Sequence, residues 1–174
     1  MMTLIFLTKL IMILVCQIVF LPMGQCSIDF WPMDAKLIDE TCQKTPNPNL
    51  CVSSLKSDPR SSGADVKGLG IIMVDVVKAK AIIGQNKVSG LLKQSPGDLR
   101  LKVGSGDYDA ISNHQVPNAS LAFSRDIPHI AEEDMSEAAD EARACELSFS
   151  GRSPLTDVNN AVADVAAITA AIAN

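Results

Sequence analysis

The residues best able to do covalent chemistry are the cysteines, and their spacing is uneven. Beyond the first 26 residues, Cys42 and Cys51 lie close together, whereas Cys145 lies far from both. Oxidising compartments favour disulfide bonds. An odd number of cysteines in an exported chain indicates either a lost partner or a bond to another molecule. Cys145 is therefore the residue that most needs an explanation.

The other reactive side chains form no catalytic pattern. The sequence contains neither a G-x-S-x-G nor an H-E-x-x-H motif, and His114 and His129 lie in no known catalytic pattern. Zinc would need about four nitrogen or sulfur ligands, and the spacing of the histidines and cysteines offers no such cluster. The net charge of −5 argues against nonspecific binding to nucleic acid, because that binding needs lysine and arginine at the phosphates. We expect no enzyme, no metal site, no cofactor and no nucleic-acid partner.

The first 26 residues have the layout of a secretory signal peptide. Lys9 precedes an apolar run over residues 10–21, and small residues stand at Gly24 and Cys26, three and one positions before the predicted cleavage site. The alternative is an uncleaved membrane anchor, for which the run is short of the roughly 20 residues that a span needs. We predict a secreted chain of residues 27–174 with no membrane partner. The sequon at Asn118 is a candidate glycosylation site.

The segment around Cys42 and Cys51 predicts a helical hairpin over residues 27–60. The loop between the two cysteines contains Pro46 and Pro48, which favour a turn over a helix. The flanking stretches are typical of short helices. We expect one bridge between the two cysteines to staple this hairpin.

Four longer stretches predict amphipathic helices, because apolar residues recur in steps of three and four. The first ends at residues 94–98, and Gly84 and Gly90 each weaken it by about 1 kcal/mol relative to alanine. The second covers residues 99–123, with a kink or break expected at Pro117. Ser153 is the expected cap of the fourth.

The four predicted apolar stripes are as follows: Leu69, Ile72, Val76, Ala79 and Ile83; Val103, Tyr108, Ile111 and Leu121; Met135, Ala138, Ala142, Cys145 and Phe149; and Leu155, Val158, Val162, Val165, Ile168 and Ile172. The acids opposite the third stripe, including Glu137 and Glu141, are expected to be a solvated surface.

Short connections place successive helices antiparallel. The fold class is therefore all-α, an up-down-up-down four-helix bundle over residues 61–174 after the disulfide-stapled hairpin.

Two stretches resemble the plant invertase/pectin methylesterase inhibitor family. The first, residues 38–74, is IDETCQKTPNPNLCVSSLKSDPRSSGADVKGLGIIMV, and the second, residues 142–172, is ARACELSFSGRSPLTDVNNAVADVAAITAAI. The TC-x8-C spacing and the CE-x-x-FSG-x-SPLT pattern carry the resemblance, which covers essentially the whole of residues 27–174. It implies a small secreted helical bundle that binds and blocks carbohydrate-active enzymes of the cell wall or vacuole.

The resemblance also explains the isolated cysteine. Family members carry a second bridge between the second and third bundle helices, and one of its cysteines lies four residues before a tyrosine. Here Tyr108 and Cys145 match, but the position four before Tyr108 is Gly104. We expect Cys145 to be an unpaired buried thiol in a monomer, or the link in a covalent dimer if it is exposed.

The resemblance favours invertase as the target. In that branch, a Pro-Lys-Phe segment before the third bundle helix enters the invertase active site; here the segment is Pro128, His129 and Ile130. Histidine is cationic only below about pH 6.5, so we expect inhibition that weakens towards neutral pH. The alternatives are a pectin methylesterase inhibitor, whose contacts would use the bundle face, and a diverged noninhibitory protein. We expect export to the apoplast or cell wall, with the vacuole as the alternative.

Overall fold

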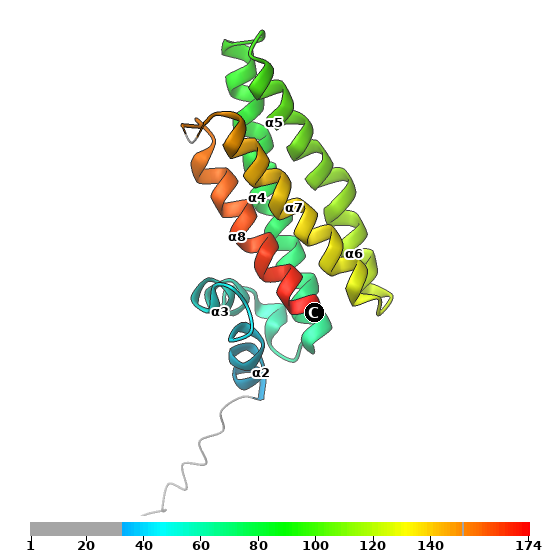
Figure 1. Cartoon of the computed structure of the whole chain (residues 1–174). Coiled ribbons are helices and arrows are strands. Elements are labelled where there is room, and N and C mark those ends of the chain that lie inside the picture. Colours follow the sequence, from blue (N-terminus) through cyan, green and yellow to red (C-terminus); the bar gives the residue numbers. More distant parts are fainter. Residues whose placement is uncertain (1–32, 151) are drawn as a thin grey trace, which may run out of the picture. The chain divides into compact units, whose positions relative to one another are not determined.

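The computed structural model describes residues 33–150 and 152–174, which belong to a unit of residues 31–174 (Figure 1). The predicted signal peptide, residues 1–26, lies outside the described residues. Every regular element in the described ranges is helical, which agrees with the predicted all-α class.

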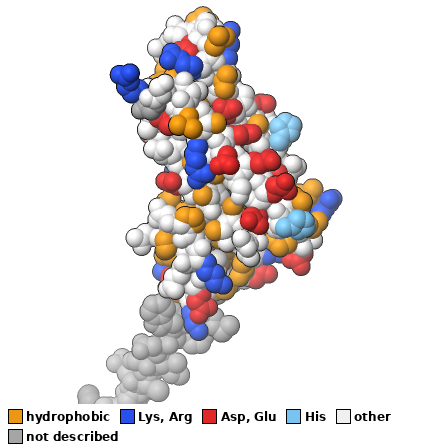
Figure 2. Space-filling view, in the orientation of Figure 1, with side chains coloured by type: hydrophobic (Ala, Val, Ile, Leu, Met, Phe, Trp, Pro, Cys, Tyr) orange, Lys and Arg blue, Asp and Glu red, His pale blue; other side chains and the backbone are white. Residues whose placement is uncertain are grey.

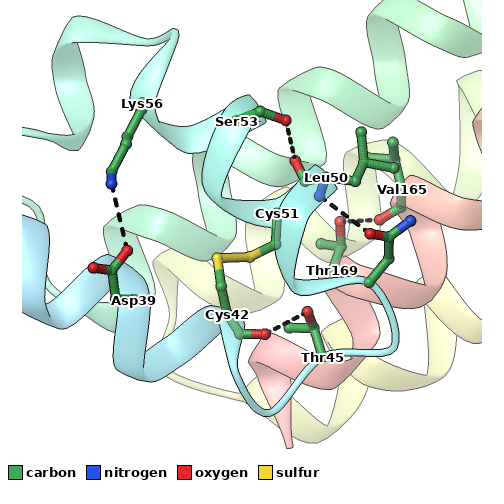
Figure 3. Close-up of a disulfide and its surroundings, with 10 residues drawn as sticks. Asp39, Cys42, Thr45, Leu50, Cys51, Ser53, Lys56, Val165 and Thr169 are labelled. Atoms are coloured by element: carbon green, nitrogen blue, oxygen red, sulfur yellow. Dashed lines mark hydrogen bonds and ion pairs between the residues drawn. A yellow bond between two sulfur atoms is a disulfide. The ribbon is translucent and has the colours of Figure 1, made fainter.

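The N-terminal hairpin is formed by α2 (Met33–Cys42) and α3 (Pro48–Lys56). Cys42 and Cys51 are joined by a disulfide bond and are fully buried, as predicted (Figure 3). Asn47 caps α3 by accepting a hydrogen bond from the Leu50 backbone N–H at 3.2 Å, and Pro48 occupies the first turn. The cap of α3 and the disulfide bond together hold the two helices of the hairpin.

Four long antiparallel helical segments form the bundle (Figure 1). They are α4 (Val66–Gln94), the continuous stretch of α5 (Leu99–Ala110) and α6 (Val116–Ser124), α7 (Pro128–Ser148), and α8 (Thr156–Ala173). A short 3-10 turn, Pro59–Ser61, precedes α4. Helix α8 packs against both α4 and α7. The predicted four-helix bundle with a stapled hairpin is confirmed.

The buried stripes of α7 and α8 are those predicted from sequence, and every residue of the two predicted sets is buried. The stripe of α4 is partly wrong, because Ala79 and Ile83 are exposed while Val77 and Ala81 are buried. Apolar residues occur nearly all around α4, so its spacing fits more than one face. The buried face of α4 is the one on which Gly70 and Gly84 allow the rings of Phe123 and Tyr108 to pack closely.

The middle of the second long helix also differs from the prediction. A π-helical turn, Ile111–Gln115 (the π-turn), joins α5 to α6 directly before Pro117. A proline lacks the N–H that a helix interior needs, and a π-turn is one way to accommodate this without a break. Tyr108 and Ile111 are buried as predicted, whereas Val103 and Leu121 are exposed.

The start of α8 is two residues later than predicted. Ser153 accepts a hydrogen bond from the Leu155 backbone N–H at 3.0 Å, but this closes a local turn, and the helix begins at Thr156. Leu155 at the helix boundary is fully buried. The side chain of Ser153 therefore shapes the connection between α7 and α8 rather than capping α8.

Candidate partner-binding site

The chain reverses direction between α6 and α7 within three residues. The Ile127 N–H donates to the Ala122 carbonyl at 2.9 Å, and the Asp126 N–H donates to the Phe123 carbonyl at 3.2 Å. Asp126 has a φ of 62°, so the three residues form a Schellman motif with aspartate in the left-handed position. The start of α7 is consequently held against the end of α6.

The predicted enzyme-contacting residues, Pro128, His129 and Ile130, form the first turn of α7 and are exposed. The sequence predicted a loop before the third bundle helix, and this placement is wrong. Proline is favoured as the first helical residue, since its missing N–H is not needed there, so the helix starts at this segment. Ile127 and Ile130 are 36% and 37% exposed, which leaves an apolar edge beside the histidine.

A groove of about 380 Å³ opens beside Pro128. It lies among the hairpin, the beginning of α4, the end of α6 and the end of α8. Its lining residues are Thr41, Lys44, Val66, Lys67, Phe123, Asp126, Pro128, Ala171, Ile172, Ala173 and Asn174. None of these described lining residues is a histidine, cysteine or serine. The groove combines apolar walls with the charged side chains of Lys44, Lys67 and Asp126.

The charge along α7 changes from one end to the other. Exposed acids Glu133, Glu137 and Asp140 follow one another along the helix, and Figure 2 shows red side chains gathered over this face. His129 lies at the N-terminal end, where the helix dipole is positive. The first turn of α7, residues 128–131, carries no acidic side chain, whereas acids begin directly after it at Glu132.

Cys145 of α7 is an unpaired thiol and is fully buried. A Cβ added at Gly104 of α5 would lie 2.8 Å from the Cys145 Sγ. Position 104 is therefore the one facing the lone cysteine, as the family resemblance implied. Because the thiol is buried, its sulfur is not accessible for a disulfide bond to another molecule.

Cys145 is expected to react with an alkylating reagent about a hundredfold more slowly in the folded protein than after unfolding. Burial raises the pKa of this thiol to about 11, and only the thiolate reacts. Mass spectrometry of the mature chain, with and without urea, measures the rate. Rapid labelling without urea, or a covalent dimer on a non-reducing gel, would contradict a buried free thiol.

Asn118 lies exposed on α6, and its side chain interacts with Asp134 of α7. A glycan at Asn118 remains a prediction.

A polar chain of hydrogen bonds crosses the core and was missed in the sequence. The Tyr108 hydroxyl donates to Asn159 Oδ1 at 2.8 Å, and Asn159 Nδ2 donates to Glu146 Oε2 at 2.9 Å. Thr156 Oγ1 donates to the other Glu146 oxygen at 2.7 Å. The signal for this network was Asn159, a polar residue inside the apolar stripe of α8, because a buried amide needs partners.

Nothing in the described ranges gathers three or more histidine, cysteine or acidic side chains into a metal-binding group. The first turn of α7 and the groove beside it are both accessible. An exposed apolar edge beside a groove is a surface that a partner protein could contact.

Residues 36–172 match the family described as plant invertase/pectin methylesterase inhibitor, so the chain belongs to this family of inhibitor proteins. Among its relatives is the "Cell wall / vacuolar inhibitor of fructosidase 1" of Arabidopsis thaliana, which is 39% identical over 80% of this chain and 68% of the relative. The "Pectinesterase inhibitor" of Actinidia deliciosa is 36% identical over 66% of this chain and 63% of the relative.

The fold has a close counterpart among solved structures. A crystal structure of a mutant form of a pectin methylesterase inhibitor from Arabidopsis superposes with a TM-score of 0.65 at 19% identity. The match covers 76% of this chain and 92% of that chain. No described helix has the length and apolar character needed to cross a membrane.

Proposed function

We propose that this protein is a secreted inhibitor of plant acid invertase that occludes the enzyme's active site with Pro128, His129 and Ile130. The exposed, firmly held first turn of α7 is the observation that carries this proposal. The 39% identity to an inhibitor of fructosidase supports invertase as the target. The cell wall or apoplast is the proposed location, with the vacuole as the alternative, and the buried Cys145 favours a monomer.

The chemistry of the two surfaces is complementary. Invertases resemble retaining glycosidases, whose clefts hold two carboxyl groups about 5 Å apart. A protonated imidazole at position 129 would face these carboxyl groups, and the positive end of the α7 dipole would add to the attraction. The helical placement of His129 therefore adds a second source of positive potential that a loop would lack. Ile130 supplies an apolar contact beside it.

Replacing His129 with lysine is expected to change inhibition in a pH-dependent way. Lysine keeps its charge over this range, whereas an ordinary imidazole with a pKa of about 6.5 is only about a quarter protonated at pH 7. The two proteins should therefore inhibit about equally near pH 5, and the lysine variant should inhibit about fourfold more strongly near pH 7. Titration of each protein into cell-wall invertase, following sucrose hydrolysis, measures both affinities. The comparison at a fixed pH cancels the enzyme's own pH dependence.

Two controls sharpen this experiment. His129→Asn should weaken inhibition at pH 5, whereas His114→Asn, which changes the exposed histidine of the π-turn, should leave it unchanged. A constant ratio of affinities between His129→Lys and the unchanged protein at both pH values would show that protonation of position 129 plays no part. No inhibition by any variant, from protein shown to be folded, would remove invertase as the target.

The second candidate target is pectin methylesterase, favoured by the 36% identity to a pectinesterase inhibitor. This activity would use the bundle face, so all variants at His129 should inhibit pectin methylesterase equally. If neither enzyme is inhibited, the protein has a noninhibitory role.

A further inference from the structure

Two carboxyl groups are partly buried between α5 and α7. Asp107 lies one turn after Gly104 on α5, and Glu141 lies one turn before Cys145 on α7. Because the two helices are antiparallel, both carboxyls lie on the same side of the contact between Gly104 and Cys145, which no bond closes. The sequence predicted that Glu141 belongs to a solvated surface, and this is wrong, because one of its oxygens is fully buried.

The hydrogen bonding of these groups is incomplete. Glu141 Oε1 accepts a hydrogen bond from Gln115 Nε2 at 3.0 Å. Glu141 Oε2, Asp107 Oδ2 and the Oε1 of Gln115 are buried without a donor from the described residues. All three atoms are acceptors when the carboxyls are ionised, and Gln115 is only 6% exposed. A proton on either carboxyl supplies a donor that this interface otherwise lacks.

The surrounding charges are mostly unfavourable to ionisation. Glu141 faces Asp107 of α5, Glu137 of its own helix and His114 of the π-turn, of which only His114 favours its charged form. Asp107 also acts on the Cys145 thiol of α7 and on the Tyr108 hydroxyl of α5. No ion pair joins either carboxyl to a described side chain of α4 or α8.

The loss of water around the two carboxyl groups shifts both pKa values in the same direction. Burial raises the pKa of Asp107 and the pKa of Glu141, and the charge of Asp107 raises the pKa of Glu141 further. When a carboxyl pKa is higher in the folded chain than in the unfolded chain, the folded state binds more protons between the two values. This contribution to stability is complete in acid and is lost as pH rises through the folded pKa.

We propose that Asp107 and Glu141 make the α5–α7 interface proton-dependent, closed in acid and opening locally when both carboxyls ionise. The π-turn is the segment that gives way, because Gln115 contacts Glu141 and because π-turns depart from regular helix geometry. The missing disulfide bond leaves this interface free to respond. This property is independent of which enzyme the protein binds.

The labelling rate of Cys145 tests the proposal, since its sulfur lies in this interface. The mature chain and its Glu141→Gln variant are compared, at one pH at a time, using a disulfide reagent that reacts with thiols in acid. At pH 5 the two rates should be about equal; at pH 7 the unchanged protein should react roughly tenfold faster. Comparison at the same pH cancels the ionisation of the thiol itself.

Control variants separate local opening from other effects. Glu133→Gln, an exposed acid of α7 one turn further from Glu141, should label like the unchanged protein at both pH values. The fall in urea midpoint from pH 5 to pH 7 should be smaller in Asp107→Asn than in the unchanged protein, and smaller still when both carboxyls are replaced. Equal labelling of the unchanged protein and Glu141→Gln at pH 7, or the same effect from Glu133→Gln, would overturn the proposal.

Discussion

Replacing Gly104 with cysteine is expected to produce a disulfide bond to Cys145 that raises the free energy of unfolding by about 4 kcal/mol over the reduced form of the variant. A Cβ at position 104 lies 2.8 Å from the Cys145 sulfur. An S–S bond of about 2.05 Å implies a separation of roughly 3 Å between these atoms, so little movement is needed. The bond closes a loop of about 40 residues, which restricts the unfolded chain.

Urea unfolding of the oxidised and reduced variant measures this gain, and mass spectrometry counts the thiols. Gly106→Cys is the matched control, because a Cβ at Gly106 of the same helix meets nothing within contact distance and should not bridge to Cys145. If Gly104→Cys kept two free thiols under oxidising conditions, α5 and α7 would not have the register described here. The oxidised variant should also lose the proton-dependent opening of this interface.

Replacing Gly84 with alanine is expected to lower the free energy of unfolding by about 3 kcal/mol. The added Cβ would overlap Cε1 and Cζ of Tyr108, which lies directly against the α4 backbone. The ring has little freedom to move, because it is fully buried and its hydroxyl donates to Asn159. Urea unfolding monitored by circular dichroism measures the loss.

Gly90→Ala provides the opposite control within α4. A Cβ at Gly90 meets nothing within contact distance, so this change should stabilise the protein by about 1 kcal/mol through helix propensity alone. Gly70 resembles Gly84, since its Cβ would overlap the ring of Phe123. If Gly84→Ala and Gly90→Ala shifted the urea midpoint in the same direction, the packing of Tyr108 on Gly84 would be wrong.

These glycines show where sequence reasoning reached its limit. In the sequence, Gly84 and Gly90 both read as weak points of a helix, and helix propensity treats them alike. The two glycines differ in packing, because the ring of Tyr108 lies against Gly84 and no described side chain lies against Gly90. Tyr108 belongs to α5, so this contact depends on how α5 packs against α4. The buried face of α4 was misassigned for the same reason, because the rings of Tyr108 and Phe123 select it.

Other elements were predictable because local signals agreed with one another. The stripes of α7 and α8 fit a single face, so the periodicity identified their buried residues. The disulfide between Cys42 and Cys51 followed from their close spacing around two prolines. The position opposite Cys145 came from family resemblance, and periodicity alone would not have selected Gly104. Pro128–Ile130 lie in the first turn of α7 rather than in a loop, because proline is favoured as the first residue of a helix; their contact with an enzyme stays a prediction.

The residues that make the family recognisable hold α7 and α8 together. In the CE-x-x-FSG-x-SPLT stretch, Glu146 accepts from Thr156 and Asn159, while Phe149 and Leu155 are buried. Any member with this bundle needs such a connection, whichever enzyme it meets. Selection on this stretch would therefore act on folding and not on the choice of target. A connection of this kind serves the fold whichever enzyme is bound, so one chain can resemble inhibitors of two different enzymes.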